Sequence, residues 1–285
     1  MNPFDIPHDL LDELVRRALR EDIGDGDRTV MTLIPADAHA QAHIITREAA
    51  VIAGAPVAAA VFAAVDPTLT VQILVAEGGH VAANTPLLTL SGNARSILMG
   101  ERVALNLMQR MCGIATYTAA FVAAVAGLPA RILDTRKTTP GLRVLEKYAV
   151  RMGGGMNHRF GLYDAILIKD NHLALLQGQG LSLSAIVQQA QDRTSPFVVV
   201  EVEVESVEQA LEAADAGADI ILLDNMHPDQ LREVVRLLGG RVPLEASGGI
   251  TLATIRAVAE SGVDYISVGG LTHSVRSIDL SLELE

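Results

Sequence analysis

The chain has 285 residues, a formal net charge of −12 and 49% hydrophobic residues. Its length suits one large α/β domain or two smaller ones, and its apolar content is enough for a substantial core. The acidic balance argues against general binding to nucleic acids or membrane surfaces, because both attract proteins through a basic face.

The only cysteine, Cys112, excludes a disulfide within the chain. It stands in the apolar run MQRMCGIAT, which predicts a small buried side chain rather than a nucleophile. The segment MNPFDIPHDLL lacks a basic region followed by an apolar core, so no signal peptide is expected there. No run of 18 uncharged apolar residues occurs, so no membrane span is expected, and the sequence predicts a cytoplasmic protein.

The first part of the chain has the pattern of an α+β module. Asp9 is a candidate N-cap for a helix, because apolar residues recur at helical spacing from Leu10 to Leu19. An acidic loop broken by glycines is expected at 21–29. From Ala38 to Ser91 apolar and polar residues alternate, which predicts strands, with one helix near 55–64.

A helical period continues over 95–126, where Gly113 predicts a break between two helices. Within this stretch Arg102 follows Glu101 in otherwise apolar surroundings. A surface ion pair and a buried or interfacial guanidinium are both open interpretations of Arg102.

From Arg131 onward, six short apolar runs recur at a spacing of mostly twenty-odd to thirty-odd residues. They are RILD, DAILIK, FVVVEVEV, DIILLD, VPLEASGG and DYISVGG. This is the length of a βα unit, and repeated units predict a parallel sheet or barrel.

Nearly every run leads into a polar group, and in βα barrels the functional face lies at the carboxyl ends of the strands. We therefore expect a convergent ring of side chains. Its members are Thr135, Arg136, Lys137, Lys169, Asp170, Asn171, Glu201, Glu203, Asp224, Asn225, Ser247, Gly248, Gly249, Gly269 and Gly270.

Positive charge is concentrated in one segment. Residues 131–169 carry eight Lys and Arg against three Asp and Glu, and they contain all three lysines, Lys137, Lys147 and Lys169. Lysine supplies a point charge that arginine does not replace. A basic island in an acidic protein indicates a small, multiply anionic substrate. Arg143, Lys147 and Arg151 share a helical segment and are expected mostly at the surface.

Two glycine turns, SGGIT at 247–251 and VGG at 268–270, present backbone N–H groups where barrels commonly hold phosphate. A role only in tight turning is the alternative, and phosphate binding is favoured. The glycine-rich stretch 151–161 predicts a loop in close contact with another group. There Arg159, together with Arg136, could grip carboxylates, and His158 could donate a hydrogen bond or take up a proton.

The alternating Glu201, Glu203 and Glu205 share one face of a strand. Carboxylates inside a barrel are costly unless they are paired or bind a metal. Glu203 and Asp224 suggest Mg²⁺ held mostly through water, or an ion pair with Lys137 or Lys169, and both can hold.

Several blocks together resemble the quinolinate phosphoribosyltransferase family over nearly the whole chain. They are REDIGDGDRT, ERVALNLMQRMCGIAT, LDTRKTTPGLRVLEKYAVRMGGGMNHRFGLYDAILIKDNH, VEVEVES, LLDNM and LEASGGI. The resemblance implies an open sandwich-like α+β domain, at 1–112, with the tail 275–285 packed on it. An incomplete α/β barrel at 113–274 would carry the active site. It also implies a homodimer or an assembly of dimers.

The implied reaction transfers phosphoribosyl from 5-phosphoribosyl 1-diphosphate (PRPP), with Mg²⁺, to quinolinate. Decarboxylation then gives nicotinate mononucleotide in NAD biosynthesis.

The resemblance also implies which residues bind the substrates. Those implied to hold quinolinate are Arg136, His158, Arg159, Lys169 and Arg102 of the partner subunit, with Thr135 and Lys137 also facing the substrates. Ser247 to Gly249, Gly269 and Gly270 would take the 5′-phosphate. Glu203 and Asp224 would take the ribose and Mg²⁺; the 21-residue spacing selects Glu203, and Glu201 stays an alternative. Lys137, Lys169, Glu203 and Asp224 are the expected catalytic residues.

Three other interpretations remain open. A class I aldolase-like barrel would use Lys169 as a Schiff-base nucleophile. A non-catalytic homologue would only bind a phosphoribosyl metabolite. A related pyrophosphorylase would act on a different acceptor.

Overall fold

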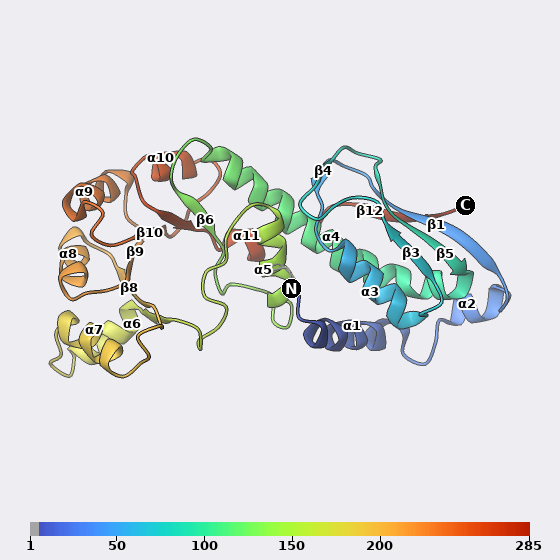
Figure 1. The fold of residues 1–285 in the computed structure, drawn as a ribbon, viewed down its shortest axis with the longest axis horizontal. Coiled ribbons are helices and arrows are strands. Elements are labelled where there is room, and N and C mark those ends of the chain that lie inside the picture. The colour runs from blue at the N-terminus through green and yellow to red at the C-terminus, as the bar shows by residue number, and fades with distance from the viewer. Residues whose placement is uncertain (1–5) are drawn as a thin grey trace. The chain divides into compact units, whose positions relative to one another are not determined.

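The computed structural model describes residues 6–285, which form two compact units (Figure 1). One unit combines the described chain up to Ala119 with Thr138–Gly154 and Leu271–Glu285, and the other comprises Ala120–Lys137 and Gly155–Gly270. The first five residues of the segment in which no signal peptide is expected lie outside the described residues. No helix in the described chain is long and apolar enough to span a membrane.

The first unit is built on an antiparallel sheet with strand order β12-β1-β5-β3. These strands are β1 (His39–Thr46), β3 (Thr70–Ile73), β5 (Pro86–Asn93) and β12 (Leu280–Leu284), and β2 (Ala50–Val51) pairs separately with β4 (His80–Val81). Its helices are α1 (His8–Ile23), α2 (Arg28–Leu33), α3 (Ala55–Val65), the greater part of α4 (Ala94–Ala124), α5 (Arg143–Met152) and most of the short α11 (Gly270–His273).

Alternation along β1 explains how the sheet faces its core. Ala42, Ile44 and Thr46 are buried, whereas the residues between them are partly exposed. The far C-terminal strand β12 pairs antiparallel with β1, with Ile44 opposite Leu282. The end of the chain therefore contributes an edge strand to the first unit.

Helix α4 is continuous over 31 residues, so the expected break at Gly113 is wrong. A Cβ atom at position 113 would lie 2.2 Å from the carbonyl oxygen of Arg276. The glycine therefore allows a close approach of backbone to helix and does not end the helix. Its neighbour Cys112 is buried as expected. There its Sγ atom contacts the backbone of Ala53, and burial raises the pKa of the thiol to about 12.

Two expectations for the N-terminal helices need correction. Helix α1 follows Pro7 without a side-chain cap, so Asp9 lies in its first turn and does not cap it. The acidic segment 21–29 is loop only between α1 and α2, where Asp27 caps α2 by accepting the N–H of Val30 (2.9 Å).

Helix α5 forms where its periodicity predicts, but Lys147 is only 1% exposed and the surface expectation for it is wrong. Its neighbour Glu146 is also buried, and its carboxylate accepts a hydrogen bond from Arg110 (2.7 Å). Charged residues thus share the buried side of α5 with Leu145, Ala149 and Val150. Helical periodicity in a sequence predicts which residues are buried only when those residues are apolar, so it does not reveal a buried lysine.

The second unit is an open, six-stranded parallel sheet of strand order β6-β11-β10-β9-β8-β7 within the described chain. Its strands are β6 (Arg131–Leu133), β7 (Ile166–Ile168), β8 (Val200–Val204), β9 (Ile220–Asp224), β10 (Leu244–Ser247) and β11 (Tyr265–Ser267). The helices are α6 (Asp170–Gln177), α7 (Leu183–Asp192), α8 (Val207–Asp215), α9 (Pro228–Leu238) and α10 (Ile255–Ala259). Because β6 and β7, the two ends of this strand order, do not pair with each other, the barrel is not closed, which confirms the expected incomplete α/β barrel.

The segment around Met156 extends the sheet beside β6. Met156 forms a parallel bridge with Leu133 and donates its N–H to the carbonyl of Ile132 (2.8 Å). Asp134 donates its own N–H to the carbonyl of Met156 (3.1 Å). This short pairing places His158 and Arg159 beside the carboxyl end of β6.

Candidate active site

A cavity of about 390 Å³ lies at the carboxyl ends of the parallel strands. The residues that line it are Thr135, Arg136, Lys137, His158, Arg159, Leu167, Lys169, Glu203, Leu222, Asp224, Glu245, Ser247 and Ser267. Every strand of the second sheet supplies a lining residue from its end or from the loop that follows. The expected convergence at this edge of the sheet is therefore present in the fold.

Cationic and anionic side chains meet in this cavity. Lys169, which follows β7, places Nζ 2.5 Å from Oε2 of Glu203 on the neighbouring β8. Arg159 is held by a hydrogen bond from its guanidinium to the carbonyl of Ala165 (3.0 Å). Burial and then the charge of Arg136 lower the pKa of Arg159. Two guanidinium groups in mutual repulsion favour an anion between them.

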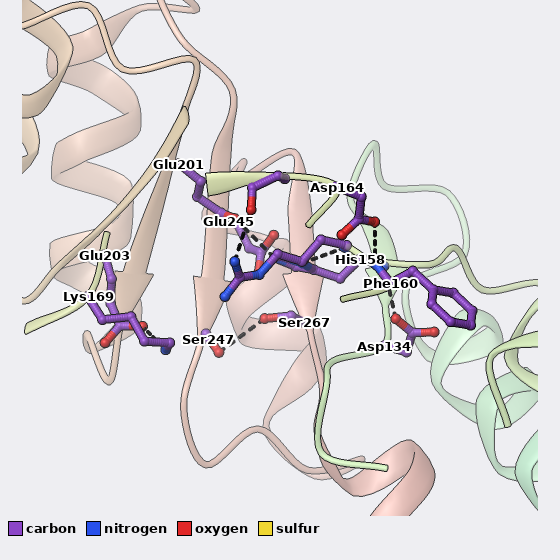
Figure 2. Close-up of polar contacts among 12 residues, drawn as sticks. Asp134, His158, Phe160, Asp164, Lys169, Glu201, Glu203, Glu245, Ser247 and Ser267 are labelled. Atoms are coloured by element: carbon purple, nitrogen blue, oxygen red, sulfur yellow. Dashed lines mark hydrogen bonds and ion pairs between the residues drawn. The ribbon is translucent and has the colours of Figure 1, made fainter. Parts of the chain in front are cut away.

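Asp134 organises the loop that carries His158. It is fully buried, and its carboxylate accepts a hydrogen bond from the side-chain amide of Asn157 (2.6 Å). It also accepts the backbone N–H of His158 (2.9 Å) (Figure 2). Asp134 was not predicted as a site residue, although it stands at the end of the RILD run. A carboxylate that accepts several N–H groups fixes a loop more firmly than apolar contacts do.

His158 lies against two buried carboxyl groups, as Figure 2 shows. Its Nε2 atom is 3.0 Å from Oε2 of Glu201 and 3.6 Å from Oε1 of Glu245. Burial and the Glu201 carboxylate raise the pKa of Glu245 to about 7. Glu245 was missed; its place two residues before Ser247, on the same face of β10, was the available signal.

Glu203 and Asp224 both line the cavity, from neighbouring strands. Glu203 is already paired with Lys169, and Asp224 accepts a hydrogen bond from the side chain of Asn225 (2.6 Å). Their oxygens are hard donors of the kind Mg²⁺ prefers. Among the described residues, the three-membered group with metal-ligand spacing is His158, Glu201 and Glu245, so Glu203 and Asp224 offer only part of a coordination shell.

The first glycine turn is divided between two cavities. Ser247 lines both, whereas Gly248 and Gly249 line a second cavity of about 480 Å³ beside the loop after β9. Gly248 has φ +96°, and a Cβ there would lie 2.2 Å from Oδ1 of Asn225. The conformation of the turn and its close packing are therefore enough to explain this glycine, without a ligand. Gly249 has φ +59°, and a Cβ built there would have no atom within 4 Å, so the space beside this glycine is open to a ligand. Gly269 and Gly270 line neither cavity.

Arg102 belongs to the first unit. Its side chain is 57% exposed and lies 3.9 Å from that of Glu101, within ion-pair distance. Exposed ion pairs contribute little to stability. Within a single chain Arg102 therefore fits the surface interpretation.

Comparison with known proteins identifies relatives over almost the whole chain. Family models for the N-terminal and C-terminal domains of quinolinate phosphoribosyl transferase match residues 27–112 and 114–283. A probable nicotinate-nucleotide pyrophosphorylase [carboxylating] from Synechocystis is 44% identical, over 98% of this chain and 94% of the relative.

Solved structures agree with this relationship. NadC from Streptococcus pyogenes superimposes with a TM-score of 0.94 at 41% identity, over 99% of this chain and 98% of the other. The nicotinate-nucleotide pyrophosphorylase from Francisella tularensis gives 0.92 at 40% identity, with the same coverage of both chains.

Proposed function

Because the chain belongs to the quinolinate phosphoribosyltransferase family, we propose that it transfers the phosphoribosyl group of PRPP to quinolinate. Decarboxylation follows, so that the products are nicotinate mononucleotide, CO₂ and pyrophosphate. One observation carries this proposal: Arg136, Lys137, Arg159 and Lys169 surround the same cavity as Glu203 and Asp224. Two anionic substrates that repel each other need such a cationic surrounding to meet.

The reaction begins when the quinolinate nitrogen attacks C1 of the ribose and pyrophosphate leaves. Positive charge develops on the ribose ring, and the Glu203 and Asp224 carboxylates stabilise it. The bond between C2 and its carboxylate then breaks and CO₂ departs. The electron pair stays on C2, stabilised by the adjacent pyridinium nitrogen, and C2 then takes up a proton from solvent. Arg136 and Arg159 hold the quinolinate carboxylates through paired N–H donors, and Lys137 and Lys169 supply point charges.

Asp224 and Glu203 are the carboxylates that would hold, partly through water, the Mg²⁺ accompanying PRPP, and the ion would supply positive charge for the pyrophosphate. Asp224 is the better placed carboxylate for it, because Glu203 already holds Lys169 at 2.5 Å. Two oxygen donors with water suit this ion, which usually keeps several waters. Ser247 and Gly249 are proposed to hold the 5′-phosphate.

The aldolase-like alternative fits the site less well. A Schiff-base lysine must be uncharged to attack a carbonyl. Nζ of Lys169 instead donates a hydrogen bond to the Glu203 carboxylate at 2.5 Å, so the amine is already engaged by a neighbouring anion. The ion pair therefore favours a role for Lys169 as a fixed cation.

The proposal extends to the oligomeric state of the enzyme and to its location in the cell. We propose a homodimer in which Arg102 of the partner subunit completes the quinolinate site. The exposed guanidinium of Arg102 supports this role, because an exposed arginine is available to another chain. We also propose a cytoplasmic location, to which the single buried, unoxidised cysteine is suited.

Incubation with quinolinate, PRPP and Mg²⁺ tests the proposed reaction, with nicotinate as the control acceptor. We expect nicotinate mononucleotide and CO₂ in equal amounts from quinolinate, and little product from nicotinate. Equal turnover of nicotinate, or product without CO₂, would favour a related pyrophosphorylase with another acceptor. Binding of PRPP without pyrophosphate release would indicate a non-catalytic homologue.

A further inference from the structure

Two buried carboxyl groups in the second unit have no part in the proposed reaction. Glu201 is 3% exposed and Glu245 is 1% exposed. Oε1 of each carboxyl accepts no hydrogen bond from the described residues. Burial of a carboxylate is costly unless it is paired or hydrogen-bonded. Both groups approach Nε2 of His158, at 3.0 Å and 3.6 Å.

The spacing of His158, Glu201 and Glu245 would suit a metal ion, since their ligand atoms lie within 4.8 Å of one another. The hydrogen bonding of the ring argues against this use. A histidine that binds a metal through Nε2 carries its proton on Nδ1 and donates it to a neighbouring acceptor. Nδ1 of His158 instead accepts the backbone N–H of Arg159 (2.7 Å). The ring proton is therefore on Nε2 and points toward the carboxyl groups.

We propose that Glu201 is a positioning residue, which accepts the Nε2 proton of His158 and thereby fixes the ring that holds the backbone of Arg159. The contacts form a chain: Glu201 to Nε2 (3.0 Å), then Nδ1 to the Arg159 N–H (2.7 Å). Asp134 anchors the N–H of His158 at the same time (2.9 Å). This inference rests on the proposed function, because it takes Arg159 to bind a carboxylate of quinolinate.

Glu245 is the second carboxyl group near Nε2 of His158, and it stabilises the contact between His158 and Glu201. It comes from β10, whereas Glu201 comes from β8, so the two carboxyl groups approach His158 from different strands. Burial and the Glu201 carboxylate raise the pKa of Glu245, so Glu245 keeps its proton to a higher pH and then repels Glu201 less. Nearby, Ser267 donates a hydrogen bond to Ser247 (3.0 Å), so polar contacts line this wall of the cavity.

The test compares Glu201→Ala and Glu201→Gln with Glu205→Ala, a control on an exposed residue just beyond the same strand. We expect Glu201→Ala to raise the KM for quinolinate about tenfold, because the Nε2 proton loses its acceptor. The KM for PRPP should change less than about twofold, since the chain of contacts leads to Arg159 alone. Glu201→Gln should recover most of the affinity through its carbonyl oxygen, and Glu205→Ala should match the wild type.

Nitrogen NMR of the histidine-labelled wild type gives a second readout that requires no variant of Glu201 to fold. A His158→Gln variant assigns the signal among the eight histidines of the chain. We expect His158 to be neutral with its proton on Nε2. A proton on Nδ1, or an unchanged quinolinate KM in folded Glu201→Ala, would overturn the inference. If the wild type does not convert quinolinate at all, the proposed function fails, and the NMR result still decides whether Glu201 positions the ring.

Discussion

At the scale of single residues, the pairing of Lys169 with Glu203 has the clearest consequence. The two groups lie 2.5 Å apart and both line the cavity. Removal of the lysine leaves a carboxylate without its partner in a partly buried site and removes one of the cations that face the substrates.

We therefore expect Lys169→Ala to lower kcat/KM about a hundredfold or more, with only a modest fall in the thermal unfolding midpoint because Lys169 itself is 42% exposed. Arg232→Ala is the matched control, because Arg232 forms an exposed ion pair with Asp229 on α9. Steady-state kinetics and thermal unfolding of both variants check this. Turnover close to that of the wild type in Lys169→Ala would contradict the role given to this residue.

Glu245 predicts a pH dependence of stability. Burial and the Glu201 carboxylate raise its pKa from 4.5 to about 7, so the folded chain binds this proton more tightly than the unfolded chain. The stabilisation is complete below pH 4.5 and is lost as the pH rises through about 7. Between these limits the wild type should lose on the order of 3 kcal/mol of unfolding free energy relative to Glu245→Gln.

Denaturant unfolding at a series of pH values measures this difference. Glu205→Gln serves as the control, because an exposed carboxyl group should give a difference that does not vary with pH. A constant difference between the wild type and Glu245→Gln would show that Glu245 titrates normally.

At the scale of secondary-structure elements, helix α4 depends on a glycine. A Cβ atom at position 113 would lie 2.2 Å from the carbonyl oxygen of Arg276 and 3.2 Å from the Cα of Ser277. Both neighbours are backbone, so relief of the clash requires a shift of the chain itself.

We expect Gly113→Ala to lower the unfolding free energy by about 2 kcal/mol or more, although alanine favours helix over glycine by about 1 kcal/mol. Asn106→Ala, on the exposed side of the same helix, should leave stability unchanged or slightly raised. Calorimetric unfolding of both variants is the measurement. A stabilised Gly113→Ala would show that the segment around Arg276 moves freely.

The elements also show how far the sequence predicts the structure. Strands β6 to β11 follow from apolar runs at βα spacing, and the polar ring follows because parallel strands end at one edge. The continuity of α4 and the burial of Lys147 do not follow, because each depends on contacts with segments distant in sequence. Glu245 belongs with these: its alternation with Ser247 was visible, but its approach to His158 depends on the loop fixed by Asp134.

At the scale of the whole molecule, the proposed dimer makes a prediction about shared sites. Arg102→Ala and Lys137→Ala should each be nearly inactive alone. If Arg102 of the partner subunit completes each site, mixed dimers contain one intact site, and an equimolar mixture should recover up to about a quarter of wild-type activity. The mixture is assayed after dissociation and reassociation of the subunits. Activity that stays at the level of the separate variants would mean that each chain uses its own Arg102.

The central claim is that one cavity at the strand ends brings two anionic substrates together. A crystal structure with quinolinate and an unreactive PRPP analogue tests it most directly. We predict the quinolinate carboxylates against Arg136 and Arg159, with its ring nitrogen facing C1 of the ribose and the carboxylates of Glu203 and Asp224 beside that ribose. Quinolinate bound away from this cavity, or the two ligands in separate cavities with no approach between nitrogen and C1, would contradict the account.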